Sequence, residues 1–387
     1  MAERLVIRDF GPIRSADLEL RNLTVFVGPQ ATGKSLAAQV LFFLNSIGDF
    51  LDVIPPDIQG APQMALEAMA WWFGNKPSTY ASSGSLLRWE PTPGDESTAV
   101  EIRWNGDGVE LSPALIERLH TQRRQLRSSL PLERIYMPGG RTLYSFLPSY
   151  TRAFSRAARD WPGYVQNFYE ILGYVIRYLS STHLTSSGRQ MSLPILDWPV
   201  EFCNKRIETI LKGQLRYARD SVGLDIGRRR ILSAMTIASG QMEIWPFWAV
   251  LEALFDSPLS DYRICIEEPE AHLHPRAQRT VMEIIASLAN VNLRFLLTTH
   301  SPYIVYAVNN FLLAQEVLRT GQPLPEKTVP PQAVLNPNMV SSYRFGEDGH
   351  VHDILDSTLG LIDEDELDSI ADELGASFTA LQEALML

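Results

Sequence analysis

Three short stretches of the sequence bring together residue types that bind phosphate or activate water. The first, GPQATGKS at residues 28–35, has two glycines with four residues between them, followed directly by lysine and serine. Glycines in such a loop let backbone N–H groups surround phosphate oxygens, while Lys34 can reach the outer phosphates and the Ser35 hydroxyl can bind Mg²⁺. The predicted nucleotide-binding residues here are Gly28, Pro29, Gln30, Ala31, Thr32, Gly33, Lys34, Ser35 and Leu36.

Carboxylates follow an apolar run in RICIEEPEAHLHP, residues 263–275, which places three glutamates and two histidines within eight positions. A site that hydrolyses a nucleotide needs a carboxylate near the magnesium ion and a second group that orients the attacking water. We assign Glu267, with Ser35, to the magnesium ion and Glu268 to the role of catalytic base. Both acids end the apolar run, where a strand would deliver them to one edge of a sheet.

The two histidines of this stretch raise the alternative of a zinc site. His272 and His274 lie two residues apart and share no helical face, so their spacing argues against zinc ligation. We predict instead that they belong, with Glu270, to a turn that enters a helix at Pro275.

The third stretch, LLTTHSP at residues 296–302, ends another apolar run with a histidine. A histidine at the carboxyl end of a strand can hydrogen-bond a γ-phosphate and the attacking water. The stretch ASGQ, residues 238–241, places small residues at the start of a helix, where they form either a cap or an anion site. In this motif order we interpret Ser239, Gly240 and Gln241 as a nucleotide-binding signature loop. The catalytic candidates are Lys34, Glu268 and His300.

Hydrophobic periodicity predicts the elements that position these residues. Residues 5–27 alternate and then become continuously apolar, which predicts two half-exposed strands and one buried strand that ends at the glycine loop. Residues 34–51 have helical spacing, so strand, loop and helix follow in order. Beyond residue 216, helices alternate with the strands RICIEE and LRFLLTTH, which implies a partly parallel sheet. We predict an α/β fold: a P-loop nucleotide hydrolase with a mixed sheet flanked by helices.

The sequence predicts that the chain is divided into four segments. Residues 1–142 form an N-terminal lobe, with a Pro-, Gly- and Ser-rich insertion at about 55–130 that contains a hairpin turning at Asn105 to Gly108. Residues 143–215 form a helical insertion that lacks long heptads and is therefore compact. Residues 216–320 form a C-terminal lobe, and 321–387 an extension that ends in an acidic amphipathic helix.

Composition restricts the class of protein. The net charge is −11, yet residues 345–387 hold twelve Asp and Glu and no Lys or Arg, so the rest of the chain is nearly neutral. Near-neutrality neither indicates nor excludes nucleic acid. Two cysteines without motif spacing, an N-terminus unlike a signal peptide and no apolar stretch of roughly 20 residues predict a cytoplasmic protein without a membrane partner.

Taken in order, GPQATGKS, ASGQ, IEEPEAHLHP and LLTTHSP resemble the ABC-type ATPase heads of the SMC, RecF and OLD-like group. The motifs EEPEAHLHP and TTHSP resemble most closely those of anti-phage defence ATPases, namely OLD-like proteins and the ATPase subunits of Septu and PARIS systems. This resemblance implies ATP and Mg²⁺ as cofactors and a head-to-tail homodimer or higher oligomer bridged by ATP. Ser239 and Gly240 of one copy would then close on the γ-phosphate held by the other, and the turn with His272 and His274 would meet the partner head.

Two departures from these families affect what the resemblance implies. Arg141 follows YMPGG where a glutamine-bearing loop is expected, and we consider both a phosphate contact and a surface position for it. OLD nucleases continue into a TOPRIM domain, whereas the 87 residues after His300 lack the acidic strands that such a domain requires. The chain would therefore control a separately encoded effector, such as a nuclease or toxin, in anti-phage defence. The alternative is an SMC- or RecF-like clamp in DNA repair or recombination, with arginines around residues 123–127, 216–219 and 228–230 on the phosphates.

Overall fold

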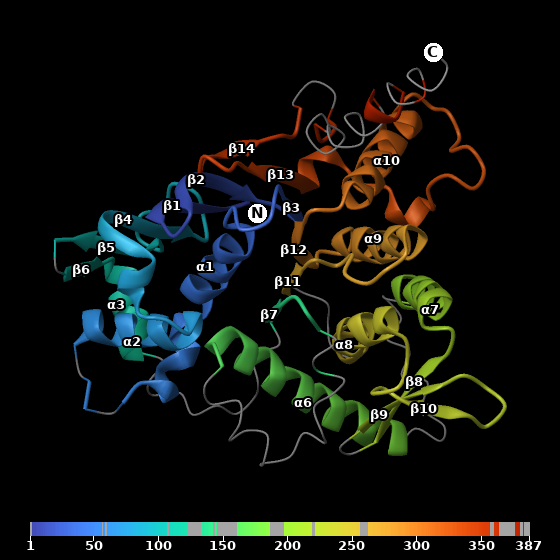
Figure 1. The fold of residues 1–387 in the computed structure, drawn as a ribbon, viewed down its shortest axis with the longest axis horizontal. Helices are drawn as coiled ribbons and strands as arrows, with labels where there is room; N and C mark the ends of the chain where they lie inside the picture. Colours follow the sequence, from blue (N-terminus) through green and yellow to red (C-terminus); the bar gives the residue numbers. More distant parts are fainter. Residues whose placement is uncertain are drawn as a thin grey trace.

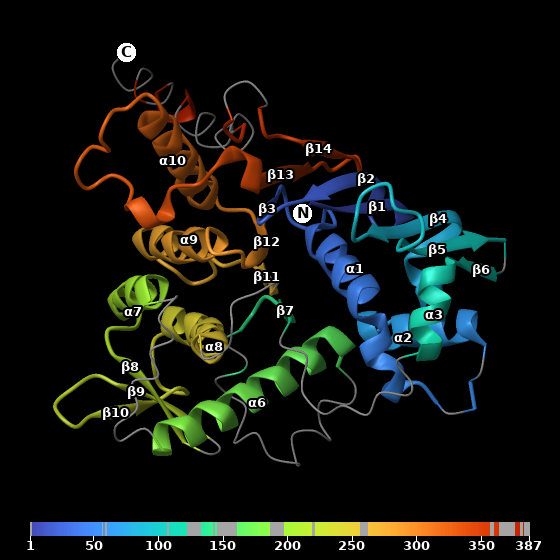
Figure 2. The ribbon, with the colours of Figure 1, turned by 180° about the vertical axis from the view of Figure 1, so that it is seen from behind.

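The computed structural model of this chain places the predicted strands and helices in layers around a central sheet. It describes residues 2–55, 57–58, 60–106, 108–121, 133–141, 144, 161–185, 197–218, 221–255, 262–356, 360–363, 376–379 and 382. Figure 1 and Figure 2 show the arrangement from two opposite sides.

The central sheet has six strands in the order β14-β13-β3-β12-β11-β7. Four adjacent pairs, from β13 through β7, are parallel, and only β14 runs antiparallel to its neighbour. The predicted α/β fold with a partly parallel sheet is therefore confirmed, and the carboxyl ends of the parallel strands meet at one edge. The strands are β3 (Leu23–Val27), β7 (Arg134–Met137), β11 (Arg263–Glu267), β12 (Arg294–Thr299), β13 (Val340–Phe345) and β14 (Val351–Asp353).

Side-chain alternation divides the helices between the two faces of this sheet. On β11, Cys265 packs in the same apolar cluster as α1 and α2, whereas Ile264 and Ile266 pack in the cluster of the other helices. Because successive residues of a strand face opposite sides, both faces of the sheet are covered, and β3 and β11 are buried along their whole length. The helices are α1 (Lys34–Ser46) and α2 (Ala61–Phe73) on one face, and α6 (Gly163–Thr185), α7 (Asp197–Leu211), α8 (Ser239–Leu254), α9 (Pro275–Ala289) and α10 (Pro302–Arg319) on the other.

A second, five-stranded antiparallel sheet lies beside α1 in the order β2-β1-β4-β5-β6. The strands expected before residue 20 are β1 and β2, and the hairpin expected near Asn105 is β5 and β6. Strand β4 pairs with β1, so the Pro- and Gly-rich segment extends this sheet from its edge. The elements are β1 (Glu3–Phe10), β2 (Ile13–Leu20), β4 (Ala81–Glu90), β5 (Val100–Asn105), β6 (Gly108–Leu111), α3 (Pro113–Thr121) and the 3₁₀ turns η1 (Ile47–Val53) and η2 (Pro77–Thr79).

The predicted helical insertion contains α6 and α7 among its described residues, and a small sheet leads from it to the signature loop. This sheet has the order β10-β9-β8 and comprises β8 (Gln214–Ala218), β9 (Ser221–Asp225) and β10 (Ile231–Ser233). After α10 come η5 (Pro331–Ala333) and η6 (Pro337–Met339). Most of the predicted acidic C-terminal helix lies outside the described residues, although residues 376–379 are helical. Within the described ranges, none of the helices is long and apolar enough to cross a bilayer.

Candidate active site

The predicted phosphate-binding loop connects β3 to α1 in the middle of the central sheet (Figure 1). Gly28 has a φ of 141° and Gly33 a φ of 102°, values that side-chain-bearing residues rarely adopt. A Cβ added at Gly28 would lie 2.5 Å from the Phe345 carbonyl oxygen, so β13 also restricts this position to glycine. The motif glycines are thus required by the backbone of the loop.

Lys34 opens α1 and is nearly buried beneath this loop, with 9% of its surface exposed. Its Nζ donates hydrogen bonds to the carbonyl oxygens of Gly28 at 2.7 Å and Pro29 at 2.5 Å. Burial lowers the pKa of Lys34, while the nearby carboxylates of Glu268 and Glu270 act in the opposite direction. A buried cation held by loop carbonyls lies where the outer phosphates of a nucleotide would need a positive charge.

Glu267 ends β11 with its carboxylate fixed by two donors. The Tyr136 hydroxyl donates to Oε1, and the Gly139 N–H donates to Oε2 at 2.8 Å. Tyr136 is fully buried, and burial together with the Glu267 charge raises its pKa well above the usual value, so the hydroxyl stays protonated. Tyr136 was not predicted from the sequence because it belongs to no recognisable motif. It reaches Glu267 only because β7 pairs with β11.

Glu268, the predicted base, leaves the strand through a strained backbone. Its φ is 46°, a left-handed conformation that costs a non-glycine residue about 1–3 kcal/mol and persists only where neighbours enforce it. Its N–H donates to the Thr298 carbonyl oxygen at 2.8 Å. The side chain is 43% exposed and its Oε1 lies 3.7 Å from Nδ1 of His300, itself 45% exposed. The predicted base and the predicted histidine are therefore neighbours that both reach solvent.

Glu270 lies in the turn predicted before α9, and its side chain packs with this group. The residue is 5% exposed, and its Oε1 accepts hydrogen bonds from the Thr299 hydroxyl at 2.6 Å and the His300 N–H at 3.1 Å. The same oxygen lies 3.6 Å from Nδ1 of His300. Glu270 thus fixes the end of β12, and only the two histidines of the turn remain exposed.

Those histidines behave as residues at a helix entry. His274 is the N-cap of α9, where its Nδ1 accepts a hydrogen bond from the Arg276 N–H at 3.2 Å. Among the described residues there is no group of three or more His, Cys, Asp or Glu side chains that could hold a metal ion.

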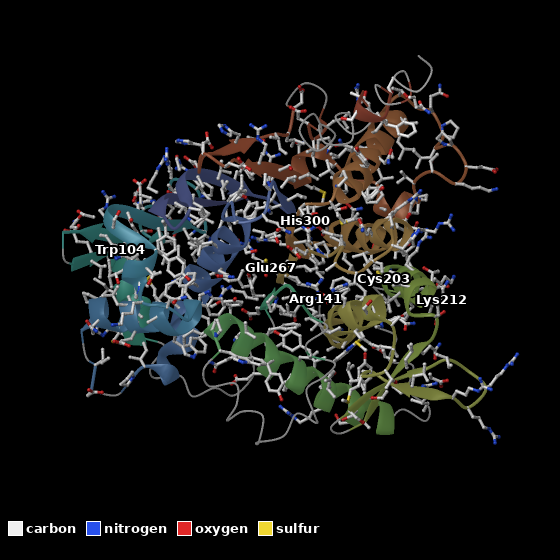
Figure 3. All side chains as sticks on the ribbon, in the orientation of Figure 1. Trp104, Arg141, Cys203, Lys212, Glu267 and His300 are labelled. Carbon is white, nitrogen blue, oxygen red and sulfur yellow. The ribbon has the colours of Figure 1, made fainter. Side chains whose placement is uncertain are left out.

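Arg141 is buried, so the surface position considered for it is wrong, and its guanidinium contacts protein acceptors. It is 1% exposed and forms an ion pair with Glu243, also 1% exposed, at 3.1 Å. Its guanidinium also donates to the carbonyl oxygens of Glu267 at 2.5 Å and Glu268 at 2.9 Å. Figure 3 labels Arg141 and Glu267 near the middle of the molecule. Glu243, on α8, was also missed by sequence reasoning.

The signature loop lies in a different environment from the phosphate-binding loop. Ser239 begins α8, and Gln241 accepts a hydrogen bond from the Ala238 N–H at 3.0 Å. A Cβ added at Gly240 would lie 2.8 Å from the His272 carbonyl oxygen, so the loop packs tightly on the turn before α9. All three signature residues line a groove of about 1170 Å³, whose other lining residues include Arg206, Lys212, His272, His274, Arg276, Arg279 and Lys327.

The comparisons with known proteins find a match to one family model and similarity to solved structures. A family model described as an AAA ATPase domain matches residues 239–305. No curated protein matches the chain. Among solved structures, the Smc head bound to the C-terminal winged-helix domain of ScpA has 11% identity and a TM-score of 0.48, with 91% of this chain and 96% of that chain covered.

Two further Smc heads give similar values. The Pyrococcus furiosus head with an extended coiled coil, bound to the C-terminal domain of ScpA, has 12% identity and a TM-score of 0.45, covering 96% of this chain and 99% of that one. The Thermotoga maritima head has 12% identity and a TM-score of 0.41, covering 91% and 98%. The segment similar to an AAA ATPase domain, residues 239–305, contains the signature loop, Glu268 and His300.

Proposed function

We propose that this chain binds ATP with Mg²⁺ and hydrolyses it. The observation that carries the proposal is the meeting of three strand ends: the Lys34 loop follows β3, Glu268 follows β11, and His300 follows β12 between them. Ligands of open α/β sheets bind at this carboxyl edge. Lys34 would hold the β- and γ-phosphates, Glu268 would take a proton from the attacking water, and His300 would contact the γ-phosphate and orient that water.

Magnesium fits the donors at this edge. The Ser35 hydroxyl and the Glu267 carboxylate are oxygen ligands of the kind that Mg²⁺ prefers. When bound, the ion would neutralise charge that develops between the outer phosphates. Tyr136 and Gly139 would keep Glu267 oriented toward it.

We further propose that two copies close on ATP, with the signature loop of one copy facing the phosphate-binding loop of the other. The groove beside the signature loop supports this, because Lys212, Arg276 and Lys327 line it and would attract an anionic ligand. From the motif resemblance we infer control of a separately encoded effector, a nuclease or toxin, in anti-phage defence. The four segments predicted from the sequence and the cytoplasmic location remain proposals as well.

The experiment compares two site variants with two surface variants. Glu268→Gln should retain ATP, abolish turnover and stabilise the dimer in size-exclusion chromatography, because the base is lost while the phosphate contacts remain. Lys34→Ala should abolish binding of a fluorescent ATP analogue. The exposed residues Glu110 and Lys76 provide matched controls, so Glu110→Gln and Lys76→Ala should behave like wild type. Turnover that is unchanged in Glu268→Gln would overturn the site.

A DNA clamp is the second candidate function, and one surface favours it. Arg228, Arg229 and Arg230 are exposed together at the turn between β9 and β10, whereas Arg216 nearby is paired with Asp225 at 3.1 Å. The arginines at 123, 124, 127 and 219 lie outside the described residues. If the turn binds duplex DNA, replacing its three arginines with Glu should weaken binding and reduce the salt slope by about three. Binding that is absent, or insensitive to salt, would reject the clamp.

A further inference from the structure

We propose that the buried pair of Arg141 and Glu243 is a strut that couples the signature helix α8 to the backbone of the catalytic base. The proposal rests on the ATPase function above and assigns Arg141 as a positioning residue for Glu268. It explains why a fully buried arginine occurs at the carboxyl edge of the sheet with its donors on backbone carbonyls and Glu243.

The guanidinium of Arg141 reaches acceptors on three elements. Nη1 donates to the carbonyl oxygens of Pro138 at 3.2 Å and Glu267 at 2.5 Å, and Nη2 donates to that of Glu268 at 2.9 Å. Nε donates to the Glu243 carbonyl oxygen at 3.2 Å, and Nη2 lies 3.1 Å from the Glu243 carboxylate. These five contacts match the five N–H donors of an arginine, so the planar fork fixes the three elements at once.

At one end, the strut stabilises the strained conformation of Glu268. The N–H of Glu268 is held by Thr298, and its carbonyl oxygen accepts from both Arg141 and the Ala271 N–H, at 3.0 Å in the latter case. A left-handed φ at a non-glycine residue persists only when surrounding bonds enforce it. Loss of the arginine would let the Glu268 backbone relax, and the carboxylate would leave its place beside His300.

At the other end, the strut is attached to the helix that carries the signature loop. Glu243 comes four residues after Ser239, about one helical turn into α8. Its carboxylate also accepts a hydrogen bond from the Arg141 N–H at 2.9 Å, so the backbone of the loop after β7 is included. A displacement of the signature loop by an incoming partner would therefore be transmitted through Glu243 and Arg141 to Glu268.

The test uses variants that separate positioning from stability. Arg141→Met alone would leave Glu243 buried without its partner, so it is combined with Glu243→Met, since replacing both charges of a buried pair with apolar residues is often neutral. Arg141→Lys keeps the charge but has no planar fork. The ion pair of Arg88 and Glu101, 2.8 Å apart on the N-terminal sheet, provides the control Arg88→Met with Glu101→Met.

For the Arg141→Met and Glu243→Met double variant we expect an unchanged Kd for ATP and a lowered Tm, because the carbonyl oxygens of Pro138, Glu267 and Glu268 lose a donor. Turnover is therefore compared at a temperature where both proteins are folded. Its kcat should fall about 10²-fold, the loss expected from a misplacement of about 1 Å at a catalytic group. Hydrogen exchange without nucleotide should accelerate in peptides that cover Glu268 and the start of α8. Arg141→Lys should show the same fall in kcat, and the Arg88 control should have the kcat of wild type, although it also loses the ion pair of Arg88 with the buried Glu90.

Each other outcome decides against one of the two proposals. A double variant with wild-type kcat, or with unchanged hydrogen exchange, overturns the strut as a positioning device. Wild-type protein without ATP hydrolysis overturns the ATPase function instead, and the exchange measurement, which needs no nucleotide, still decides whether Arg141 holds the two elements together.

Discussion

The contact between Gly240 and the turn before α9 permits a prediction of definite sign. Gly240 is the second residue of α8, and a Cβ added there would lie 2.8 Å from the His272 carbonyl oxygen and 3.3 Å from the Leu273 side chain. Exposed helical positions normally gain from a change of glycine to alanine, because glycine is less favourable than alanine by about 0.8–1 kcal/mol. Gly240→Ala should have the opposite sign, because the obstructing atom belongs to the backbone and cannot rotate away.

The size of the effect follows from two opposing contributions. Forcing one methyl group into a packed contact costs typically about 1–3 kcal/mol. After a gain of up to about 1 kcal/mol from helix propensity, the net loss of unfolding free energy is about 0–2 kcal/mol. The same displacement should separate the signature loop from the turn and lower kcat, whereas the Kd of the isolated chain for ATP should stay unchanged because the Lys34 loop is elsewhere.

Urea denaturation, fluorescent-nucleotide titration and steady-state hydrolysis would be measured for Gly240→Ala beside Gly108→Ala. A Cβ at Gly108 meets only the Asn105 carbonyl oxygen, at 3.9 Å, so this control should be neutral or slightly more stable. A Gly240→Ala protein that is about 1 kcal/mol more stable than wild type would refute the tight packing. Equal losses in Kd and kcat would refute the separation of the two loops.

Three further changes test the packing around the site and its metal. Glu3→Gln should lower the free energy of unfolding, measured in urea, by about 3–5 kcal/mol, because Glu3 pairs with both Arg263 and Arg294, which are largely buried. A loss below about 1 kcal/mol would contradict a buried ion pair. Tyr136→Phe should raise the Mg²⁺ concentration for half-maximal hydrolysis, since Glu267 loses a hydrogen bond of about 1.5–3 kcal/mol. An unchanged Mg²⁺ concentration would show that Tyr136 plays no part in binding the ion. EDTA should stop hydrolysis until Mg²⁺ is restored, without lowering the nucleotide-free Tm. A lowered Tm would indicate that a bound metal ion stabilises the fold.

The features predicted well from the sequence depend on residues that are close along the chain. The loop from Gly28 to Ser35 is recognisable because eight consecutive residues supply both its positive φ angles and its donors. The strands around it were predictable because their apolar periodicity reflects burial on one or both faces. Such signals need no knowledge of which strand pairs with which.

The features that were missed or wrong depend on distant partners. Tyr136 reaches Glu267 across 131 positions, and the N–H of Arg141 reaches Glu243 across 102. Nothing in the sequence near Arg141 distinguishes an arginine for phosphate from one for backbone carbonyls, because the distinction lies in what β11 and α8 bring to it. The contacts of Glu270 were not predicted for a related reason, since they are made with Thr299 at the end of β12 and with His300 after it.

The two adjacent glutamates show how strand register decides chemistry that composition leaves open. Glu267 pairs with Thr298, and Thr299 pairs with Val27, so the three strand ends are level to within one residue. Because faces alternate, Glu267 shares the face of Cys265, toward α1 and Tyr136, and an extended Glu268 would point to the opposite side. The left-handed turn at Glu268 ends the strand there and leaves its carboxylate exposed beside His300. A slip of one residue between β11 and β12 would exchange the faces of the two acids. The strut from Arg141 to both glutamate carbonyls therefore secures the feature on which the division between a metal-side acid and a catalytic base depends.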